Sequence, residues 1–184
     1  MTSSQADVVD LLVQQHGHIR GLFNAVDSAD DVVARQQAFE QLRRYLAVHE
    51  TAEELITHPR ARMADGGNPV VDARLHEETE AKKMLADLDG MKVDDPDFPA
   101  KFEALRDAVV AHAEAEEREE FPLLRADNDE KMLERMAAAV LAVEKIAPTH
   151  PHPSVGSSAT TNFMAGPLAS VLDRTRDAVR AALG

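Results

Sequence analysis

Hydrophobic residues recur at steps of three and four along most of this chain, which is the period of an amphipathic helix. Phe39, Leu42, Leu46 and Ile56 form one such stripe. No segment keeps the period-two alternation of a half-buried strand. The pattern therefore predicts an all-α protein, with helices over residues 4–27, 31–57, 70–88, 96–124, 131–146 and 167–183.

Short breaks separate the first four predicted helices. Pro59 follows the second helix, residues 65–69 (DGGNP) precede the third, and Pro96 precedes the fourth. Such residues stop helices and form turns, and short turns place successive helices antiparallel. We expect an up-down-up-down four-helix bundle over residues 1–125. A C-terminal helical extension over residues 126–184 follows, with a Pro-rich loop at residues 147–158.

Composition and charge narrow the class of protein. Hydrophobic residues make up 44% of the 184 residues, which is enough for a packed core. The net charge of −13, without a basic stripe, argues against a nucleic-acid partner. The absence of cysteine excludes disulfides and thiolate metal sites. The N-terminus shows no secretory signal and no long apolar run offers a membrane span, so we expect a cytoplasmic protein.

One motif occurs in both the second and the fourth predicted helix. It consists of a His, a Glu four and another five residues later, and a Pro ten residues later, and its copies begin at His49 and His112. A lone histidine lies in each preceding helix: His16 is 33 residues before His49, and His76 is 36 residues before His112. The chain therefore contains two copies of one helical hairpin.

The spacing within the motif is suited to holding metal ions. Residues i and i+4 lie on one face of a helix, so each His and its Glu can reach the same cation. The repeat brings imidazoles and carboxylates together near the bundle axis, as in other two-metal bundle sites. This mixture of nitrogen and oxygen donors suits iron, with manganese as the alternative. The predicted ligands are His16, His49, Glu53, His76, His112 and Glu116.

A purely structural bundle is the competing interpretation. A single histidine on an apolar stripe is more often a hydrogen-bonded core residue than a ligand. Six inward polar side chains are a different case, because without a cation several of them would lack partners. Each such group costs about 1–3 kcal/mol. The repeated pattern therefore favours a metal centre.

These motifs resemble the hemerythrin-like family of His-His-Glu cation-binding domains. The resemblance covers about residues 5–125 and rests on the segments LLVQQHGHIRGLF, YLAVHETAEELITHP, RLHEETEAKKML and VVAHAEAEEREEFPLL. It implies an up-down bundle that binds two non-haem iron ions, often joined by an oxo or hydroxo bridge. In such a site the four histidines are terminal ligands, and Glu53 and Glu116 bridge the irons. The later segments are similar to C-terminal extensions of actinobacterial members.

The sequence departs from the oxygen-carrying members of that family at one position. Those proteins have a His-x-x-x-His pair on the third helix, whereas here His76 is followed by Glu80. A carboxylate ligand favours the ferric state and weakens the case for reversible oxygen carriage. We interpret Glu80 as a metal ligand, as an acceptor behind a ligand, or as a solvated residue at the edge of the stripe.

Two further residues lie close to the first motif. Tyr45 precedes His49 by four residues, and could donate a hydrogen bond at the site, bind iron or be a core residue. Glu50 follows His49 directly and is a ligand in some relatives, but it faces about 100° away from His49 and ranks lower. The remaining histidines have no matching spacing and are interpreted as non-ligands: His18, His58, His150 and His152.

Resemblance to mycobacterial relatives with the same motifs implies catalase-like redox chemistry. The reactants would be the small molecules H2O2, O2 or NO, in defence against oxidative or nitrosative stress. The alternative is a module that senses, binds or stores iron or oxygen without turnover, which the extension after Pro148 favours. We expect a monomer or a weak homodimer.

Overall fold

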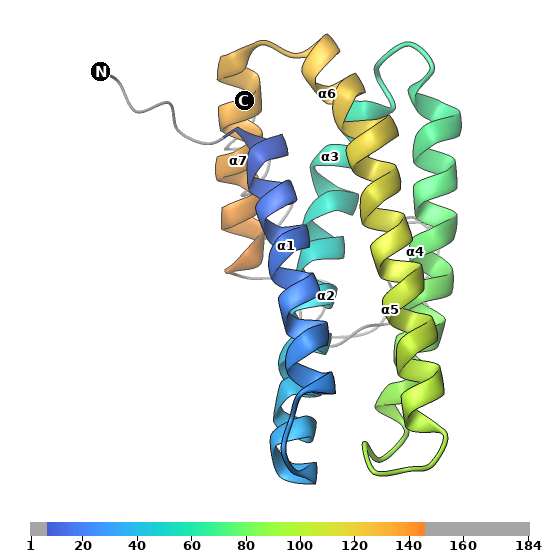
Figure 1. The fold of residues 1–184 in the computed structure, drawn as a ribbon. Coiled ribbons are helices and arrows are strands. Elements are labelled where there is room, and N and C mark those ends of the chain that lie inside the picture. Colours follow the sequence, from blue (N-terminus) through green and yellow to red (C-terminus); the bar gives the residue numbers. More distant parts are fainter. Residues whose placement is uncertain (1–6, 146–184) are drawn as a thin grey trace, which may run out of the picture.

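The computed structural model describes residues 7–145. Four long helices lie side by side and form a bundle (Figure 1): α1 (Val8–Asp27), α2 (Val32–Leu55), α4 (Gly67–Asp89) and α5 (Phe98–Ala115). Helices α1 and α2 form one hairpin, and α4 and α5 form the other. Residues 7–145 contain no strand, so the predicted all-α class is confirmed.

Aspartates fix the starts of three helices. The side chains of Asp7, Asp31 and Asp129 each accept a hydrogen bond of 2.8–2.9 Å from the backbone N–H three residues further on. An N-cap of this kind satisfies one of the free donors of the first turn. Helix α1 therefore begins at Val8 rather than at residue 4, and α7 (Glu130–Glu144) begins directly after Asp129.

Two of the predicted helices are divided where a proline follows the motif. After α2 ends, the short helix α3 (Thr57–Ala61) contains Pro59. Helix α5 continues through the π-helical segment η1 (Glu116–Glu120) into α6 (Phe121–Asp127). Pro122 lies in the first turn of α6, where its missing N–H is tolerated.

Helix α7 packs against α1 and α2. It places Leu133, Met136 and Val140 in the same apolar cluster as Leu12 of α1. This helix corresponds to the one predicted over residues 131–146. The predicted Pro-rich loop, the predicted helix over residues 167–183, and His150 and His152 all lie outside the described residues.

A polar layer divides the apolar core of the bundle into two clusters. One cluster joins α1, α2 and α3 to α6 and α7, and the other surrounds the stacked rings of Phe98 and Phe102. Between them lie buried polar side chains from α1, α2, α3, α4, α5 and η1: Gln15, His16, His49, Glu50, Glu53, His58, Arg74, Glu78, His112, Glu116 and Glu120. None of the helices within residues 7–145 is long and apolar enough to cross a lipid bilayer.

The connection between α3 and α4 depends on two glycines. Gly66 has φ = 75°, a left-handed conformation that glycine adopts without strain. Gly67 approaches α3 so closely that an added Cβ would lie 1.9 Å from the carbonyl oxygen of Ala61. The turn that returns the chain from the first hairpin to the second therefore requires glycine at position 67.

We expect Gly67→Ala to lower the free energy of unfolding by about 1–3 kcal/mol, because the new methyl group must displace backbone. Gly21→Ala is the matched control: position 21 is exposed on α1, and an added Cβ there meets nothing within 4 Å. The control should gain about 0.5–1 kcal/mol from helix propensity. Urea unfolding followed by circular dichroism measures both, and equal stabilities would contradict this description of the turn.

Candidate metal centre

Three histidines and two glutamates meet in the polar layer and form what we name the His–Glu cluster: His16, His49, Glu53, His112 and Glu116. His16 Nε2 lies 3.3 Å from Glu116 Oε2 and 3.9 Å from Glu53 Oε1. His49 Nε2 lies 3.3 Å from Glu53 Oε2, and His112 Nε2 lies 3.4 Å from Glu116 Oε1. None of the five is more than 5% exposed, so the cluster lies away from solvent.

The outer nitrogen of each clustered histidine is held by an oxygen acceptor. His16 Nδ1 lies 2.8 Å from Glu117, His49 Nδ1 lies 2.8 Å from the amide oxygen of Gln15, and His112 Nδ1 lies 2.9 Å from Glu77. Since these oxygens accept, each Nδ1–H donates, and the ring is fixed with Nε2 toward the carboxylates. The same outer hydrogen bond orients most histidine ligands of metals in proteins.

The inner atoms of the cluster lack partners. Within residues 7–145, ten buried side-chain nitrogen or oxygen atoms have no hydrogen-bond partner, and five of these are both oxygens of Glu53, both of Glu116 and Nε2 of His112. Nε2 of His16 is a sixth. Each such atom costs about 1–3 kcal/mol if it stays unpaired. A cation bound between these atoms would supply the missing interactions.

The two carboxyls of the cluster have opposite pKa shifts. Burial, reinforced by the charge of Glu116, raises the pKa of Glu53 well above its ordinary value. Burial also acts to raise the pKa of Glu116, but His112 and His16 beside it outweigh burial and hold that pKa well below the ordinary value. The pKa of His49 falls to about 3 because of burial and of the nearby His16. Without a cation, burial and the charge of Glu116 therefore favour the protonated form of Glu53, whereas His112 and His16 favour the ionised form of Glu116.

The π-helical segment η1 lets one stretch of chain supply several inward carboxylates. Glu116 faces the cluster, Glu117 reaches His16, and Glu120 accepts from His58 at 2.8 Å. A π turn holds more residues than an α turn and is frequent at functional sites. The sequence predicts a regular helix over residues 96–124, which gives neither Glu117 nor Glu120 a role at the site.

The first helices of the two hairpins correspond with an offset of 62 residues. Gln15 holds the ring of His49, as Glu77 holds the ring of His112. The next residues, His16 on α1 and Glu78 on α4, are both buried in the polar layer. The residue that takes the place of His16 in the second hairpin is therefore Glu78.

The prediction that His76 faces the interior is wrong, and of the three roles left open for Glu80 the structure supports the solvated one. His76 is exposed, and Glu80 pairs with Lys83 at 2.7 Å on the surface, where Lys83 lowers the pKa of Glu80. The buried stripe of α4 runs through Val71, Arg74, Glu78, Ala81, Leu85 and Leu88. His76 lies two residues before Glu78 and so faces about 200° away from it.

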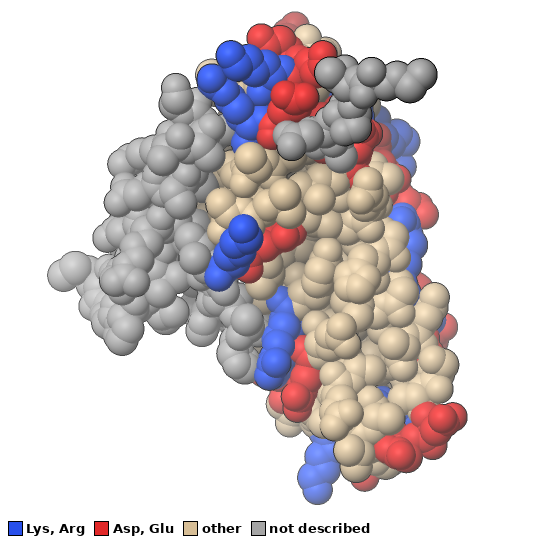
Figure 2. Space-filling view, turned by 90° about the vertical axis from the view of Figure 1, so that its left-hand side faces the viewer, with Lys and Arg blue, Asp and Glu red and all other residues tan. Residues whose placement is uncertain are grey.

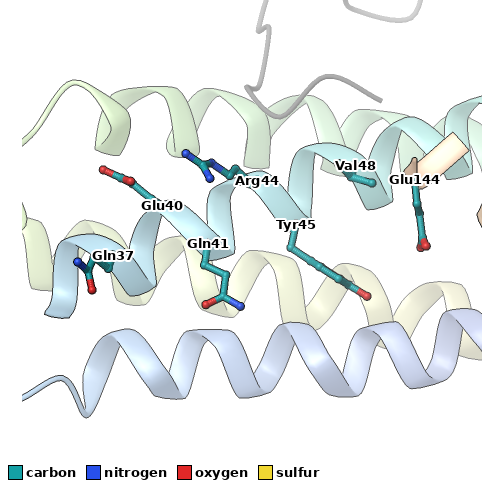
Figure 3. Close-up of a pocket in the computed structure, with 7 residues that line it drawn as sticks. All are labelled: Gln37, Glu40, Gln41, Arg44, Tyr45, Val48 and Glu144. Atoms are coloured by element: carbon teal, nitrogen blue, oxygen red, sulfur yellow. The ribbon is translucent and has the colours of Figure 1, made fainter. Parts of the chain in front are cut away.

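Tyr45 contacts residues outside the cluster. Its ring packs edge-on against His18, with 4.7 Å between ring centroids. Figure 3 shows that Tyr45 lines a surface pocket together with other residues of α2 and with Glu144 of α7. Half burial, and then the charge of Glu144, raises the pKa of Tyr45 to about 12. Of the roles that the sequence left open for Tyr45, the structure supports that of a core residue: Tyr45 packs against the apolar cluster of Phe98 and Phe102 and does not point toward the clustered histidines.

Sequence reasoning missed His58, which is fully buried. His58 Nδ1 lies 2.8 Å from Glu120, and Nε2 makes a close hydrogen bond with Glu78. Burial acts to lower the pKa of His58, but the two carboxylates raise it well above its ordinary value. The repeat itself offered a signal, because His58 and Phe121 occupy the same position in it, directly before the repeated proline. In the structure the two residues make corresponding contacts: Phe121 stacks on His16 with 5.7 Å between ring centroids, and His58 contacts Glu78.

Glu50 also belongs to the polar layer, although its position after His49 had ranked it lower. It is 7% exposed, and its Oε2 has no hydrogen-bond partner in the described part of the chain. Burial, and then the charge of Glu78, raises the pKa of Glu50 to about 8. The interior face of α2 is therefore wide enough to include adjacent residues.

Comparison with known proteins links this chain to one family. The sequence profile described as "Hemerythrin HHE cation binding domain" matches residues 7–124. An uncharacterized hemerythrin-like protein of Schizosaccharomyces pombe is 25% identical over 172 residues, which are 92% of this chain and 85% of that protein. A DNA nickase of Nostoc sp. is 25% identical over 138 residues, 75% of this chain but only 39% of the nickase.

The fold is also similar to that of a solved structure. A hemerythrin HHE cation binding domain-containing protein from Mycobacterium kansasii superposes with a TM-score of 0.68. The match covers 97% of this chain and all of that chain, at 18% sequence identity. At this identity the likeness establishes the fold alone.

Substitution of His16 or His49 by Ala should lower the affinity for a bound cation by roughly 100-fold or more. Loss of an outer partner of a ligand already costs about 10–100-fold. His76→Ala is the matched control and should bind as the unaltered protein does, because His76 is exposed. Metal analysis after dialysis against ferrous iron without oxygen measures both. Loss of the cation from His76→Ala would contradict the placement of α4.

The apparent affinity for a cation should rise with pH. Burial and Glu116 raise the pKa of Glu53, so this carboxyl holds its proton to a higher pH than an ordinary carboxyl does, and a cation must expel that proton. We expect up to about tenfold tighter binding per pH unit for each proton released, up to the raised pKa of Glu53. Competition titrations between about pH 6 and pH 8 test this. An affinity independent of pH would show that Glu53 is already ionised.

Proposed function

Because this chain belongs to the hemerythrin HHE cation-binding domain family, we propose that its His–Glu cluster binds iron and that the bound iron reacts with peroxide or dioxygen. The observation that carries the proposal is the set of buried donors without partners. Imidazole nitrogens and carboxylate oxygens from α1, α2, α5 and η1 converge within the layer that divides two apolar clusters. Such a mixture of donors suits iron better than calcium or magnesium.

One cation position fits the distances: His16, His49, Glu53 and Glu116 each offer a donor atom within 4.8 Å of the others. A second cation would take His112, whose Nε2 lies 3.4 Å from the other oxygen of Glu116. Since Oε2 of Glu116 faces His16 and Oε1 faces His112, this carboxylate is suited to bridge two irons.

The surrounding residues support redox chemistry at such a site. Bound iron would supply one-electron steps between its ferrous and ferric states. Gln15, Glu77 and Glu117 hold the imidazoles in place, and burial raises the pKa of Glu53. The ring of Phe121 stacks on His16 and shields that side of the layer from water. These features support peroxide disproportionation, which needs orientation of a small reactant rather than a large substrate pocket.

The proposed reactants are the small molecules H2O2, O2 or NO. The Nostoc relative is a DNA nickase, but this chain spans 39% of its length. On the face drawn in Figure 2, Lys and Arg side chains lie next to Asp and Glu rather than in a continuous basic stripe. Together with the net charge of −13, this supports a role without nucleic acid.

The iron-loaded protein should evolve oxygen from hydrogen peroxide, and His49→Ala should reduce the rate by roughly 100-fold or more through loss of iron. An oxygen electrode measures the rate, and metal analysis of the same samples gives the iron content. His76→Ala should keep both iron and rate. If the unaltered protein binds iron but evolves no more oxygen than His49→Ala, the centre senses or stores iron or oxygen without turnover.

A further inference from the structure

The polar layer has a first half, from the hairpin of α1 and α2, and a second half, from the hairpin of α4 and α5. The two halves differ in the basic side chains that pair with their carboxylates. On α1, Arg20 approaches Glu117 to 3.9 Å, and its side chain is 38% exposed. The residue 62 positions later on α4 is Lys82, whose side chain is 21% exposed. The ammonium of Lys82 makes a close hydrogen bond with Glu54 and lies 3.0 Å from Glu78 Oε2 and 3.7 Å from Glu50 Oε2. The second half therefore holds a cation of its own.

Both oxygens of Glu78 are paired with side chains of the protein. One of its oxygens contacts His58 Nε2 and the other contacts Lys82. His16, which holds the corresponding position in the first half, has an Nε2 without a hydrogen-bond partner in the described residues. At this position the first half thus has a metal-binding atom without a hydrogen-bond partner, His16 Nε2, whereas both oxygens of Glu78 in the second half are already paired.

Other buried atoms of the polar layer lack hydrogen-bond partners. Nε2 of His112, Oε1 of Glu116 and Oε2 of Glu50 are buried, and none has a hydrogen-bond partner within residues 7–145. Lys82 Nζ joins Glu50 to Glu78, His112 Nε2 lies 3.4 Å from Glu116 Oε1, and the charges of Glu78, Lys82, His112 and Glu116 all act on Glu50. A divalent cation and the ammonium of Lys82 would compete for the same carboxylates, because like charges a few ångströms apart repel strongly in a partly buried site.

We propose that Lys82 acts as a resident counter-cation of the second position, so that the centre binds one cation tightly and a second only as Lys82 moves aside. This inference rests on the proposed cation site. The first cation takes His16, His49, Glu53 and Glu116. The second takes His112, the other oxygen of Glu116, and Glu50 and Glu78 after they release Lys82. Lys82 thereby sets the metal content of the centre.

Anaerobic titration with ferrous iron alone, followed by equilibrium dialysis and metal analysis, tests the proposal. The unaltered protein should bind one iron tightly and a second with roughly tenfold or more lower affinity. Lys82→Met should tighten the second binding step by roughly tenfold or more and leave the first nearly unchanged. Lys83→Met is the matched control: it removes the same charge from the adjacent residue, which is 59% exposed and pairs with Glu80. It should bind as the unaltered protein does.

A second variant covers the case that Lys82→Met fails to fold because its carboxylates repel. Lys82→Met combined with Glu54→Gln keeps the net charge of the group, and it too should tighten the second step. Equal affinities of both steps in the unaltered protein, or an unchanged second step in the variant that folds, would overturn the role of Lys82. Absence of any iron binding by the unaltered protein would instead overturn the proposed function.

Discussion

The rest of the structure depends on one constraint: imidazole nitrogens and carboxylate oxygens are buried in the polar layer without hydrogen-bond partners in the described residues. Glu53 and Glu116 are fully buried beside three imidazoles, and their oxygens accept no hydrogen bond within the described part of the chain. At about 1–3 kcal/mol for each such atom, the cost is comparable with the whole stability of a domain. The apolar clusters on both sides offset it. A cation bound by these atoms would supply the missing interactions and raise the free energy of unfolding.

The two hairpins repeat the same motif positions but differ in the side chains at some of them. Each supplies a His and a Glu one turn apart, and each holds its histidine ring with an acceptor from the neighbouring helix. The chemistry diverges at His16 and its counterpart Glu78, and at Phe121 and its counterpart His58. One half of the layer thus contains buried donor atoms without partners, and in the other half Lys82 pairs with carboxylates.

The sequence was sufficient for the bundle and for the motif residues, since periodicity and the repeated offset both report helix faces. His16, His49, Glu53, His112 and Glu116 are brought together as that spacing predicts. The prediction of His76 was wrong because it followed residue type, whereas the buried stripe of α4 passes through Glu78. The contacts of Glu117 and Glu120 depend on the π-helical turn of η1, which no periodic pattern displays. Lys82 and His58 acquire their roles only from neighbours distant in sequence.

The central claim is that the His–Glu cluster holds a metal, and the most direct measurement is anomalous X-ray diffraction from crystals of iron-loaded protein at the iron absorption edge. A strong peak should lie between His16, His49, Glu53 and Glu116, with a weaker peak beside His112. Crystals of ordered protein with no anomalous peak in the polar layer, or with iron bound only by surface residues such as His76 and Glu80, would contradict it.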